Sequence, residues 1–307
     1  MRRARLDPAL RVRVTSTREL HYRDAAIPGE DRPPHVRAAS GIAMVGGRLA
    51  VVQDDASFIA LVGPGGAMSI ALPRGRAGRR RFEDALGNKA DKLDLESCIV
   101  IAGELWAFGS GSTETRERVA RVGDEVRLYD AAPLYAHLRR AIGSKINIEG
   151  VASLGDELWL FHRGNTGTGD GGPAVVRFAR EPVFAAILTE TGIFPAPLGC
   201  DRYDLGEVAG TRLGFTDAIA GDRRVFYLAA AESAPNAIDD GPVAGSQLGV
   251  IDGDSVRAAP LALDGKPIKA EGLAFDPHDP RKGWIVIDPD DTEIAAPLIA
   301  FELDGPW

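Results

Sequence analysis

The chain has 307 residues, of which 45% are hydrophobic, enough to bury the core of one large domain or two smaller ones. Its formal net charge of −8 argues against nucleic acid as a main partner. No run reaches the roughly 18 apolar residues of a membrane span, and the basic N-terminus lacks the apolar stretch of a secretion signal. We therefore expect a cytoplasmic protein without a membrane partner, while the oligomeric state stays open.

In chain order, a segment with strand chemistry comes first, at Ala9–Leu20, and five similar units follow. The units begin near residues 39, 92, 145, 213 and 268. Each begins as a strand, a turn and a second strand, and the first four continue into two further strands. The fifth unit ends one strand short.

The repeat is clearest between Lys92–Ser112 and Lys145–Asn165, which align without a gap. Both contain Glu-Leu-Trp at the start of the second strand. A fixed period of this size indicates a solenoid, a propeller or an array. One marker position, acidic or small, recurs near the start of each unit; it is occupied by Ser40, Glu96, Glu149, Asp217 and Glu271.

The repeat predicts an all-β fold, a β-propeller of five blades in one domain spanning residues 1–307. Six blades are the alternative, if the stretch between units three and four hides another blade. Pairing Ala9–Leu20 with the C-terminal hairpin would supply the missing strand, close the ring and hide the exposed sheet edges.

Two segments depart from the strand pattern. Residues 132–143 and 181–192 have helical spacing and end in Gly, a usual helix C-cap. Residues 164–172 and 232–245 are rich in Gly, Pro, Asp and Asn and predict long loops. Loops of this length in a compact fold often form the rim or lid of a site.

Alternation along a strand puts every second side chain on one face. In the first strand of the repeated units, one face carries Lys92, Asp94 and Glu96, then Lys145, Asn147 and Glu149, then Lys269 and Glu271. Burying several charges per blade against apolar walls is costly, so we expect this face to line a polar central channel. The alternative is a salt-bridge network that plugs the channel.

The ends of the second strands should reach the same mouth of the channel, because an antiparallel partner returns to where the first strand began. The charged residues predicted at this rim are Asp54, Asp55, His162, Arg163 and Asp288.

Carboxylate and amide oxygens from several segments suit a hard cation such as Ca²⁺. The predicted ligands are Glu96, Asn147, Glu149, Asp217 and Glu271. The nearby lysines leave two further interpretations open. They could neutralise the carboxylates without any ion, or they could bind a substrate phosphate or carboxylate.

At the segments Asp94–Ser97 and Ile148–Gly150, the chain resembles a bacterial six-bladed propeller group. This group includes the esterase-like phytase domain and the SMP-30/gluconolactonase proteins. The resemblance implies a channel site in which acidic and amide side chains hold one divalent cation, often Ca²⁺, and hydrolyse lactones or phosphoesters. Glu149 and Glu271 match best, with Asn147 and Asp217 after them. The lysines and the count of five blades depart from that group.

The leading hypothesis is a hydrolase of a small anionic, phosphoester or lactone-type substrate at the channel mouth. In it, Glu149 is a metal ligand or general base, His162 is a proton shuttle, and Lys145 and Arg163 complete the catalytic set. Substrate would be bound by Lys92, Lys269, Asp54, Asp55 and Asp288. The main alternative is a non-catalytic propeller that binds a metabolite or protein on its rim. A lyase or isomerase with a lysine base is a third hypothesis.

Overall fold

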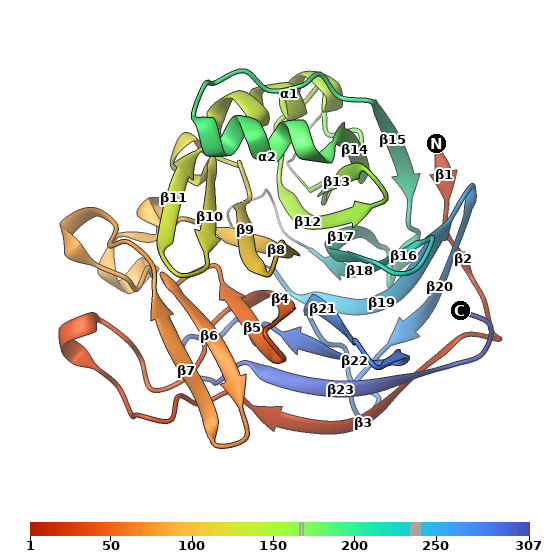
Figure 1. The fold of residues 1–307 in the computed structure, drawn as a ribbon. Coiled ribbons are helices and arrows are strands. Elements are labelled where there is room, and N and C mark those ends of the chain that lie inside the picture. Colours follow the sequence, from red (N-terminus) through yellow and green to blue (C-terminus); the bar gives the residue numbers. More distant parts are fainter. Residues whose placement is uncertain (166, 168, 234–240) are drawn as a thin grey trace.

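In the computed structural model of the chain, five β-sheets are arranged in a ring, one for each repeated unit (Figure 1). The structure describes residues 1–165, 167, 169–233 and 241–307. Neighbouring blades contact each other through their first strands, which surround the central axis. The predicted five-bladed β-propeller is therefore confirmed.

Within each blade, consecutive strands pair antiparallel from the axis outward. Blade one contains β4 (Ala39–Val45), β5 (Arg48–Gln53), β6 (Phe58–Gly63) and β7 (Gly66–Ala71). Blade two contains β8 (Leu95–Ile101), β9 (Glu104–Gly109), β10 (Arg118–Val122) and β11 (Val126–Asp130). Blade three contains β12 (Ile148–Leu154), β13 (Glu157–His162), β14 (Ala174–Ala179) and β15 (Gly199–Asp204).

Blade four begins with a short strand outside the predicted pattern. Its strands are β16 (Glu207–Val208), β17 (Thr211–Ala220), β18 (Val225–Glu232), β19 (Val243–Asp252) and β20 (Ser255–Leu261). The sequence had suggested one strand over residues 201–210. The chain instead turns after β15, and β16 pairs with β17 in the next blade. Blade five contains β21 (Ala270–Asp276), β22 (Asp279–Ile287) and β23 (Pro297–Asp304).

The N-terminal segment closes the ring, as predicted. Strand β3 (Arg11–Glu19) pairs antiparallel with β23 along its length and completes blade five. Before it, β1 (Arg2–Arg3) pairs parallel with β15, and β2 (Arg5–Leu6) pairs parallel with β20. The first 19 residues thus join blades three, four and five.

Both predicted helices are present. They are α1 (Ala132–Ile142), which a left-handed Gly143 caps, and α2 (Arg180–Thr189). They cover the outer parts of blades two and three (Figure 1). Neither helix is long and apolar enough to cross a membrane, and the same holds for every helix in the described residues. Of the two predicted loops, residues 166, 168 and 234–240 lie outside the described residues.

The core is divided among the five interfaces between blades. Each interface holds its own cluster of buried apolar side chains, contributed by the facing sheets of two neighbours. The repeated Glu-Leu-Trp element contributes to the blades themselves: Glu104 pairs with Arg121 on the next strand, and Glu157 pairs with Arg177 in the same way. The clearest part of the repeat is therefore structural.

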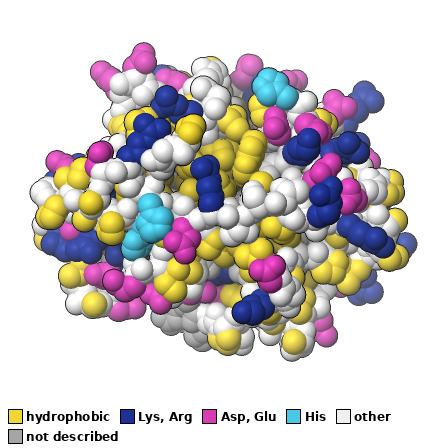
Figure 2. All heavy atoms as spheres, turned by 90° about the horizontal axis from the view of Figure 1, so that it is seen from below, with side chains coloured by type: hydrophobic (Ala, Val, Ile, Leu, Met, Phe, Trp, Pro, Cys, Tyr) yellow, Lys and Arg dark blue, Asp and Glu magenta, His cyan; other side chains and the backbone are white. Residues whose placement is uncertain are grey.

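Outside the core, basic and acidic side chains lie next to one another on the face seen from below the view of Figure 1 (Figure 2). On the outer strands of blade five, for example, Arg13 pairs with both Glu302 and Asp304. Such exposed pairs contribute little stability. Blade five is therefore held mainly by the pairing of β3 with β23.

Deleting residues 1–20 should remove β3 and expose the whole edge of β23. We expect the melting temperature to fall by roughly 10 °C or more, or the protein to be recovered unfolded. Circular dichroism during thermal melting measures this directly.

Deletion of residues 1–8 is the matched control, because it removes only the short pairs of β1 and β2. Its melting temperature should stay close to that of the full chain. If the longer deletion melts like the shorter one, β3 is not what closes the ring.

Candidate functional site

Each innermost strand carries a β-bulge near its start. In four of the five blades this bulge is at the second residue of the strand, and in the longer β17 it comes later. In the pairing with the second strand, one residue per blade is left out of register. A bulge re-aims the side chain of the extra residue. The five bulge residues, all buried, are Ser40, Glu96, Glu149, Thr216 and Glu271.

The residue after the bulge packs against the next blade. A Cβ added to Gly150 would lie 3.0 Å from the main-chain nitrogen of Ala218 on β17, and one added to Gly272 would lie 2.9 Å from the main chain of Gly41. Three of the five positions are glycine for this reason, since the inner strands approach to main-chain contact there.

In blade four, the register differs by one residue from the sequence alignment. Thr216 occupies the bulge, and its hydroxyl donates to the Ala270 carbonyl at 2.6 Å. Ser40 makes the equivalent bond to Leu95. Asp217, predicted as a ligand at the marker position, follows the bulge and accepts the Leu273 amide at 2.7 Å. Its carboxyl therefore lies between blades four and five.

Of the three bulge glutamates, Glu149 interacts electrostatically with the other two and adds to the rise in the pKa of Glu96 and Glu271. Glu149 has polar partners for its carboxylate. Its Oε1 accepts a hydrogen bond from Asn147 Nδ2 at 2.6 Å and lies 3.4 Å from Arg163 Nη1. Neither oxygen of Glu271 accepts a hydrogen bond from a described residue, and Lys269 is 3.7 Å away. Only electrostatic interactions and burial act on Glu96.

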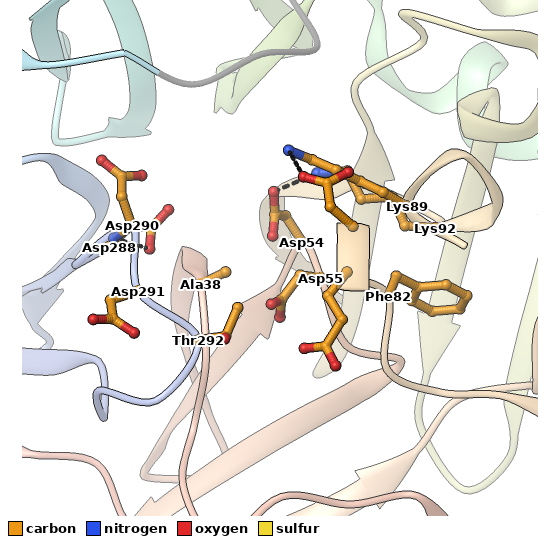
Figure 3. Close-up of a pocket in the computed structure, with 12 residues that line it drawn as sticks. Ala38, Asp54, Asp55, Phe82, Lys89, Lys92, Asp288, Asp290, Asp291 and Thr292 are labelled. Carbon is orange, nitrogen blue, oxygen red and sulfur yellow. Dashed lines mark hydrogen bonds and ion pairs between the residues drawn. The ribbon is translucent and has the colours of Figure 1, made fainter. Parts of the chain in front are cut away.

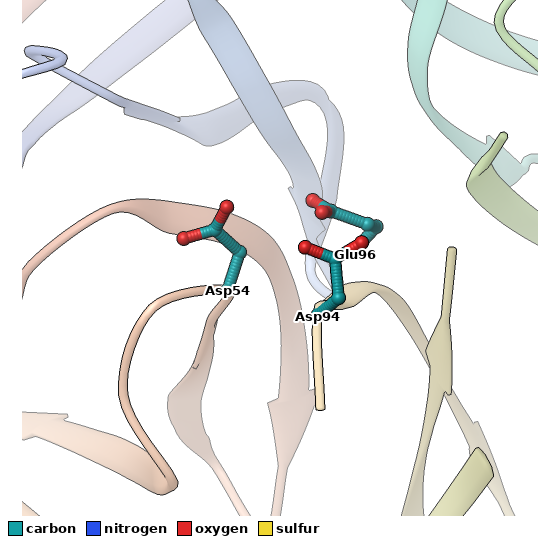
Figure 4. Close-up of side chains that lie close together, drawn as sticks. All are labelled: Asp54, Asp94 and Glu96. Carbon is teal, nitrogen blue, oxygen red and sulfur yellow. The ribbon is translucent and has the colours of Figure 1, made fainter. Parts of the chain in front are cut away.

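Glu96 lies in a compact group of acidic side chains (Figure 4). Oxygens of Asp54, Asp94 and Glu96 lie within 4.8 Å of one another. Lys92 Nζ lies 2.6 Å from both Asp54 Oδ2 and Asp94 Oδ1. Asp94 also binds Arg116 Nη1 at 2.9 Å.

Within this group, the pKa values of two neighbouring carboxyls, Glu96 and Asp94, shift in opposite directions. Burial raises the pKa of Glu96 well above its usual range, and the charges of Asp94 and Glu149 add to the effect. Burial acts on Asp94 as well, but Lys92 and Arg116 outweigh it and lower its pKa. These opposite shifts favour the protonated form of Glu96 and the ionised form of Asp94.

On the opposite side of the channel, Lys269 and Arg163 share carboxylates. Lys269 Nζ lies 2.7 Å from Asp290, 3.3 Å from Asp288 and 3.8 Å from Glu232. Arg163 Nη2 donates to Glu232. The predicted cations of the channel, Lys92, Lys269 and Arg163, are therefore all bonded to carboxylates of the protein.

Carboxylates outnumber cations in this network, which leaves the channel acidic. Among the described residues, its cations are Lys92, Arg116, Arg163 and Lys269. Its carboxyls are Asp54, Asp94, Glu96, Glu149, Glu232, Glu271, Asp288 and Asp290. Burial is the main cause of the raised pKa of Glu96, Glu149 and Glu271, and the excess of carboxylates adds to it.

Two predicted catalytic residues lie away from this network. The His162 side chain is 0% exposed; its Nδ1 contacts the main chain of Asn147 and its Nε2 contacts Asp170. It fixes the loop after β13 and does not reach the channel group. Lys145 is exposed, unlike its repeat counterpart Lys92. We leave both outside the proposed site.

The predicted Ca²⁺ ligands do not fit one cation as they lie. Among the residues that the structure describes, only the Asp54–Asp94–Glu96 group brings three carboxylates close enough to share an ion. There the Lys92 ammonium already contacts two of the three carboxylates. Asp217 faces another blade, and the three bulge glutamates do not form such a group. The Ca²⁺ site stays a prediction.

The predicted rim residues Asp54, Asp55 and Asp288 meet in a pocket of about 190 Å³ beside the channel (Figure 3). Asp55 lies at its wall, where Arg37 Nη2 binds its Oδ2 at 2.6 Å and also binds Glu83. Burial, together with the charge of Asp54, raises the pKa of Asp55 to about 7.

Sequence reasoning missed five residues of the site: Arg37, Glu83, Arg116, Glu232 and Asp290. Four of them come from loops whose paths the repeat does not fix. Glu232 is the last residue of β18, the second strand of blade four. A search for charged residues within one position of every predicted second-strand end would have found Glu232.

A comparison with protein families gives one match, over residues 35–303, to a family described as a family of unknown function (DUF6929). The chain belongs to this family. A comparison with curated proteins found no match. The resemblance to the phytase and gluconolactonase group thus stays a prediction for this DUF6929 protein.

A comparison with solved structures finds similar chains at low sequence identity. A mannose phosphorylase from Leishmania mexicana has 14% identity and a TM-score of 0.49, with 94% of this chain and 88% of that chain covered. Glutaminyl cyclase of Myxococcus xanthus has 10% identity and a TM-score of 0.46, with coverage of 96% and 97%. An exo-1,5-α-L-arabinanase from a bovine ruminal metagenomic library has 9% identity and a TM-score of 0.46, with coverage of 87% and 92%. These likenesses carry no argument about reaction or substrate.

The buried carboxyl of Asp217 should make this DUF6929 protein lose stability as pH rises. Burial raises its pKa well above 3.8, against the opposing amides of Leu273 and Ala218. A raised folded-state pKa gives stability that is complete below the unfolded pKa and is lost as pH rises through the folded pKa. Between the two values, the loss is about 1.4 kcal/mol per pH unit.

Asp217→Asn keeps an acceptor for the Leu273 amide and removes the titration. The free energies of unfolding of the two proteins should agree near pH 4 and diverge with rising pH, the variant being the more stable. Denaturant unfolding across this range measures the difference, and parallel curves would contradict the assignment.

Proposed function

We propose that this protein hydrolyses a small ester or lactone at the channel mouth, with Glu96 as proton donor and Asp54 as general base. The observation that carries the proposal is the Asp54–Asp94–Glu96 group, whose oxygens lie within 4.8 Å of one another beside Lys92. A buried carboxyl with a raised pKa can act as a general acid or a general base near neutral pH, and the pKa of both Glu96 and Asp54 is raised.

Glu96 suits the acid role because its carboxyl is buried and retains a proton. Asp54 suits the base role because it lines the pocket and its Oδ1 accepts no hydrogen bond from a described residue. Burial raises the pKa of Asp54, with Lys92 opposing the rise, toward the range in which a base works well near neutral pH.

Lys92 is the proposed oxyanion-binding group. An ammonium has three N–H donors, of which Asp54 and Asp94 take two, so a third is left for the substrate oxygen. Burial lowers the pKa of Lys92, but the carboxylates of Asp54 and Asp94 outweigh it and the pKa lies well above its usual value, which favours the charged ammonium. Asp94, held by Arg116 and Ser110, positions Lys92.

In the proposed reaction, Asp54 takes a proton from water as the water oxygen bonds to the carbonyl carbon. The negative charge that develops on the carbonyl oxygen is stabilised by Lys92. The carbonyl then reforms, the carbon–oxygen bond to the alcohol breaks, and Glu96 protonates the departing oxygen. The products are the carboxylic acid and alcohol, or the opened hydroxy acid of a lactone.

The acidic surroundings favour this substrate class over a phosphoester. A phosphate dianion would meet an excess of carboxylates, and Lys269 and Arg163 are bonded to several of them. A neutral ester meets no such repulsion. The lysine-base hypothesis is also disfavoured, because the raised pKa of Lys92 and Lys269 keeps both protonated.

A binding propeller without catalysis is the second candidate. The observation that favours it is the network around Arg163, Lys269 and Glu232, which joins blades three, four and five as a purely structural network would. This candidate predicts ligand binding at the mouth with no turnover of any ester.

Glu96→Gln should lower kcat/KM for a hydrolysed lactone or ester by roughly 100-fold or more, because the amide cannot donate the proton. Asp54→Asn should lower it by a similar factor. The melting temperature of Glu96→Gln should stay within roughly 3 °C of the parent value, since an amide replaces a carboxyl that is already neutral. A panel of small lactones and aryl esters supplies the assay.

Glu125→Gln, an exposed carboxylate far from the channel, is the matched control and should leave the rate unchanged. Each assay is repeated with EDTA and with added Ca²⁺. Full activity in Glu96→Gln would overturn the assignment of the acid. A Ca²⁺-dependent rise in both rate and melting temperature would restore the metal prediction in its place.

A further inference from the structure

The pocket beside the proposed catalytic group is lined almost entirely by carboxyl groups and their partners. It lies between the end of β5 and the loop after β22 (Figure 3). Its acidic lining residues are Asp54, Asp55, Glu83, Asp84, Asp288, Asp290 and Asp291. Its basic lining residues are Lys89 and Lys92. Phe82 and Ala38 supply apolar wall.

The nearby cations do not balance this charge. Lys92 binds Asp54, and Lys89 lies 3.6 Å from Asp84. Lys269 lies 2.7 Å from Asp290 and 3.3 Å from Asp288. Arg37 bridges Asp55 and Glu83 from behind the wall. Each cation is thus committed to the lining, and carboxylates remain in excess. A pocket of this charge attracts cations and repels anions.

Asp55 shows that the pocket is more than a cluster of surface acids. The residue is only 9% exposed, yet its Oδ1 is a buried oxygen with no hydrogen bond from a described residue. Its other oxygen is fixed by Arg37 at 2.6 and 3.0 Å. A buried acceptor left without a donor destabilises the protein, and a ligand N–H would supply the missing hydrogen bond.

The spacing of the carboxylates favours an organic cation over a metal ion. Three carboxylates come close enough to share one ion only at Asp54, Asp94 and Glu96, among the described residues. The other acids of the pocket are spread along its walls. An ammonium with several N–H donors on a carbon chain can reach separated oxygens, whereas a Ca²⁺ ion needs its oxygens about 2.4 Å away.

We propose that this pocket binds the protonated amine of the substrate, so that the hydrolysed compound is a small ester or lactone bearing an ammonium group. The volume of about 190 Å³ limits the ligand to a small molecule. Asp55 and Asp291 accept its N–H donors, and Phe82 packs against its carbon chain. This inference rests on the proposed function for the reaction, but the binding step can be measured without turnover.

The test is isothermal titration of the full chain with butylammonium, and with the neutral and anionic analogues butanol and butyrate. We expect saturable binding of butylammonium alone. Asp55→Asn should weaken it about tenfold, and Asp291→Asn at least threefold. Asp291 is exposed, and its Oδ1 accepts a hydrogen bond from the Glu293 amide that asparagine can also accept. Asp291→Asn should therefore fold even if Asp55→Asn is destabilised by loss of the Arg37 bridge.

Asp124→Asn is the matched control, an exposed aspartate on the turn between β10 and β11, and should bind like the parent. Equal binding of butanol, or unchanged affinity in Asp291→Asn and Asp55→Asn, would overturn the inference. Binding of butylammonium without hydrolysis of any amino ester would count against the proposed reaction alone. Hydrolysis of neutral lactones with no preference for amino lactones would count against the amine site alone.

Discussion

Five inner strands surround one axis, and neighbouring strands approach to main-chain contact. The approach is close just after three of the five bulges, where a Cβ on Gly41, Gly150 or Gly272 would lie 3.3 Å or less from the main chain of the next blade. Because the residue after the bulge is pressed between blades, the bulge residue itself is the one whose side chain the strand can re-aim. The three glutamates of the channel owe their position to this constraint.

Placing carboxyls there has an electrostatic consequence. A buried carboxylate needs a cation, a proton or several donors. The chain supplies Lys92, Arg116, Arg163 and Lys269, which are too few for the carboxyls around them. Burial raises the pKa of Glu96 and of Asp54, while Lys92 and Arg116 lower that of Asp94. The proposed acid and base are the two members whose pKa is raised, and Asp94 is the member that holds Lys92.

The sequence was sufficient to predict the ring, because strand number, turn positions and the missing fifth-blade strand are properties of a repeat. That Lys92, Asp94 and Glu96 lie together was also predictable, although strand alternation is not the cause, because Lys92 and Asp94 precede β8 and Asp94 has a left-handed backbone with φ 55°. The one-residue shift at Thr216 was not, because a bulge depends on how two strands pair. For the same reason, Asp217 was placed in the channel and lies between blades.

Tertiary contacts explain the remaining differences between the predicted and the observed site. His162 has a favourable position in the alignment, but the loop after β13 folds back over it and Asp170 takes its Nε2. Lys145 follows helix α1 and is exposed, whereas Lys92 follows a loop that turns it inward. Two lysines that are equivalent in the repeat thus differ in burial because the segments before them differ. Arg37 and Arg116 come from such loops as well.

The protonation state of Glu96 is the measurement that tests this account most directly. Infrared difference spectra between the parent protein and Glu96→Gln at pH 7 report whether the lost group was a carboxylic acid or a carboxylate. The account predicts loss of the carbonyl stretch of a protonated carboxylic acid. Loss of carboxylate bands alone would mean that Glu96 is ionised, and it would contradict the acid role at the centre of the proposed mechanism.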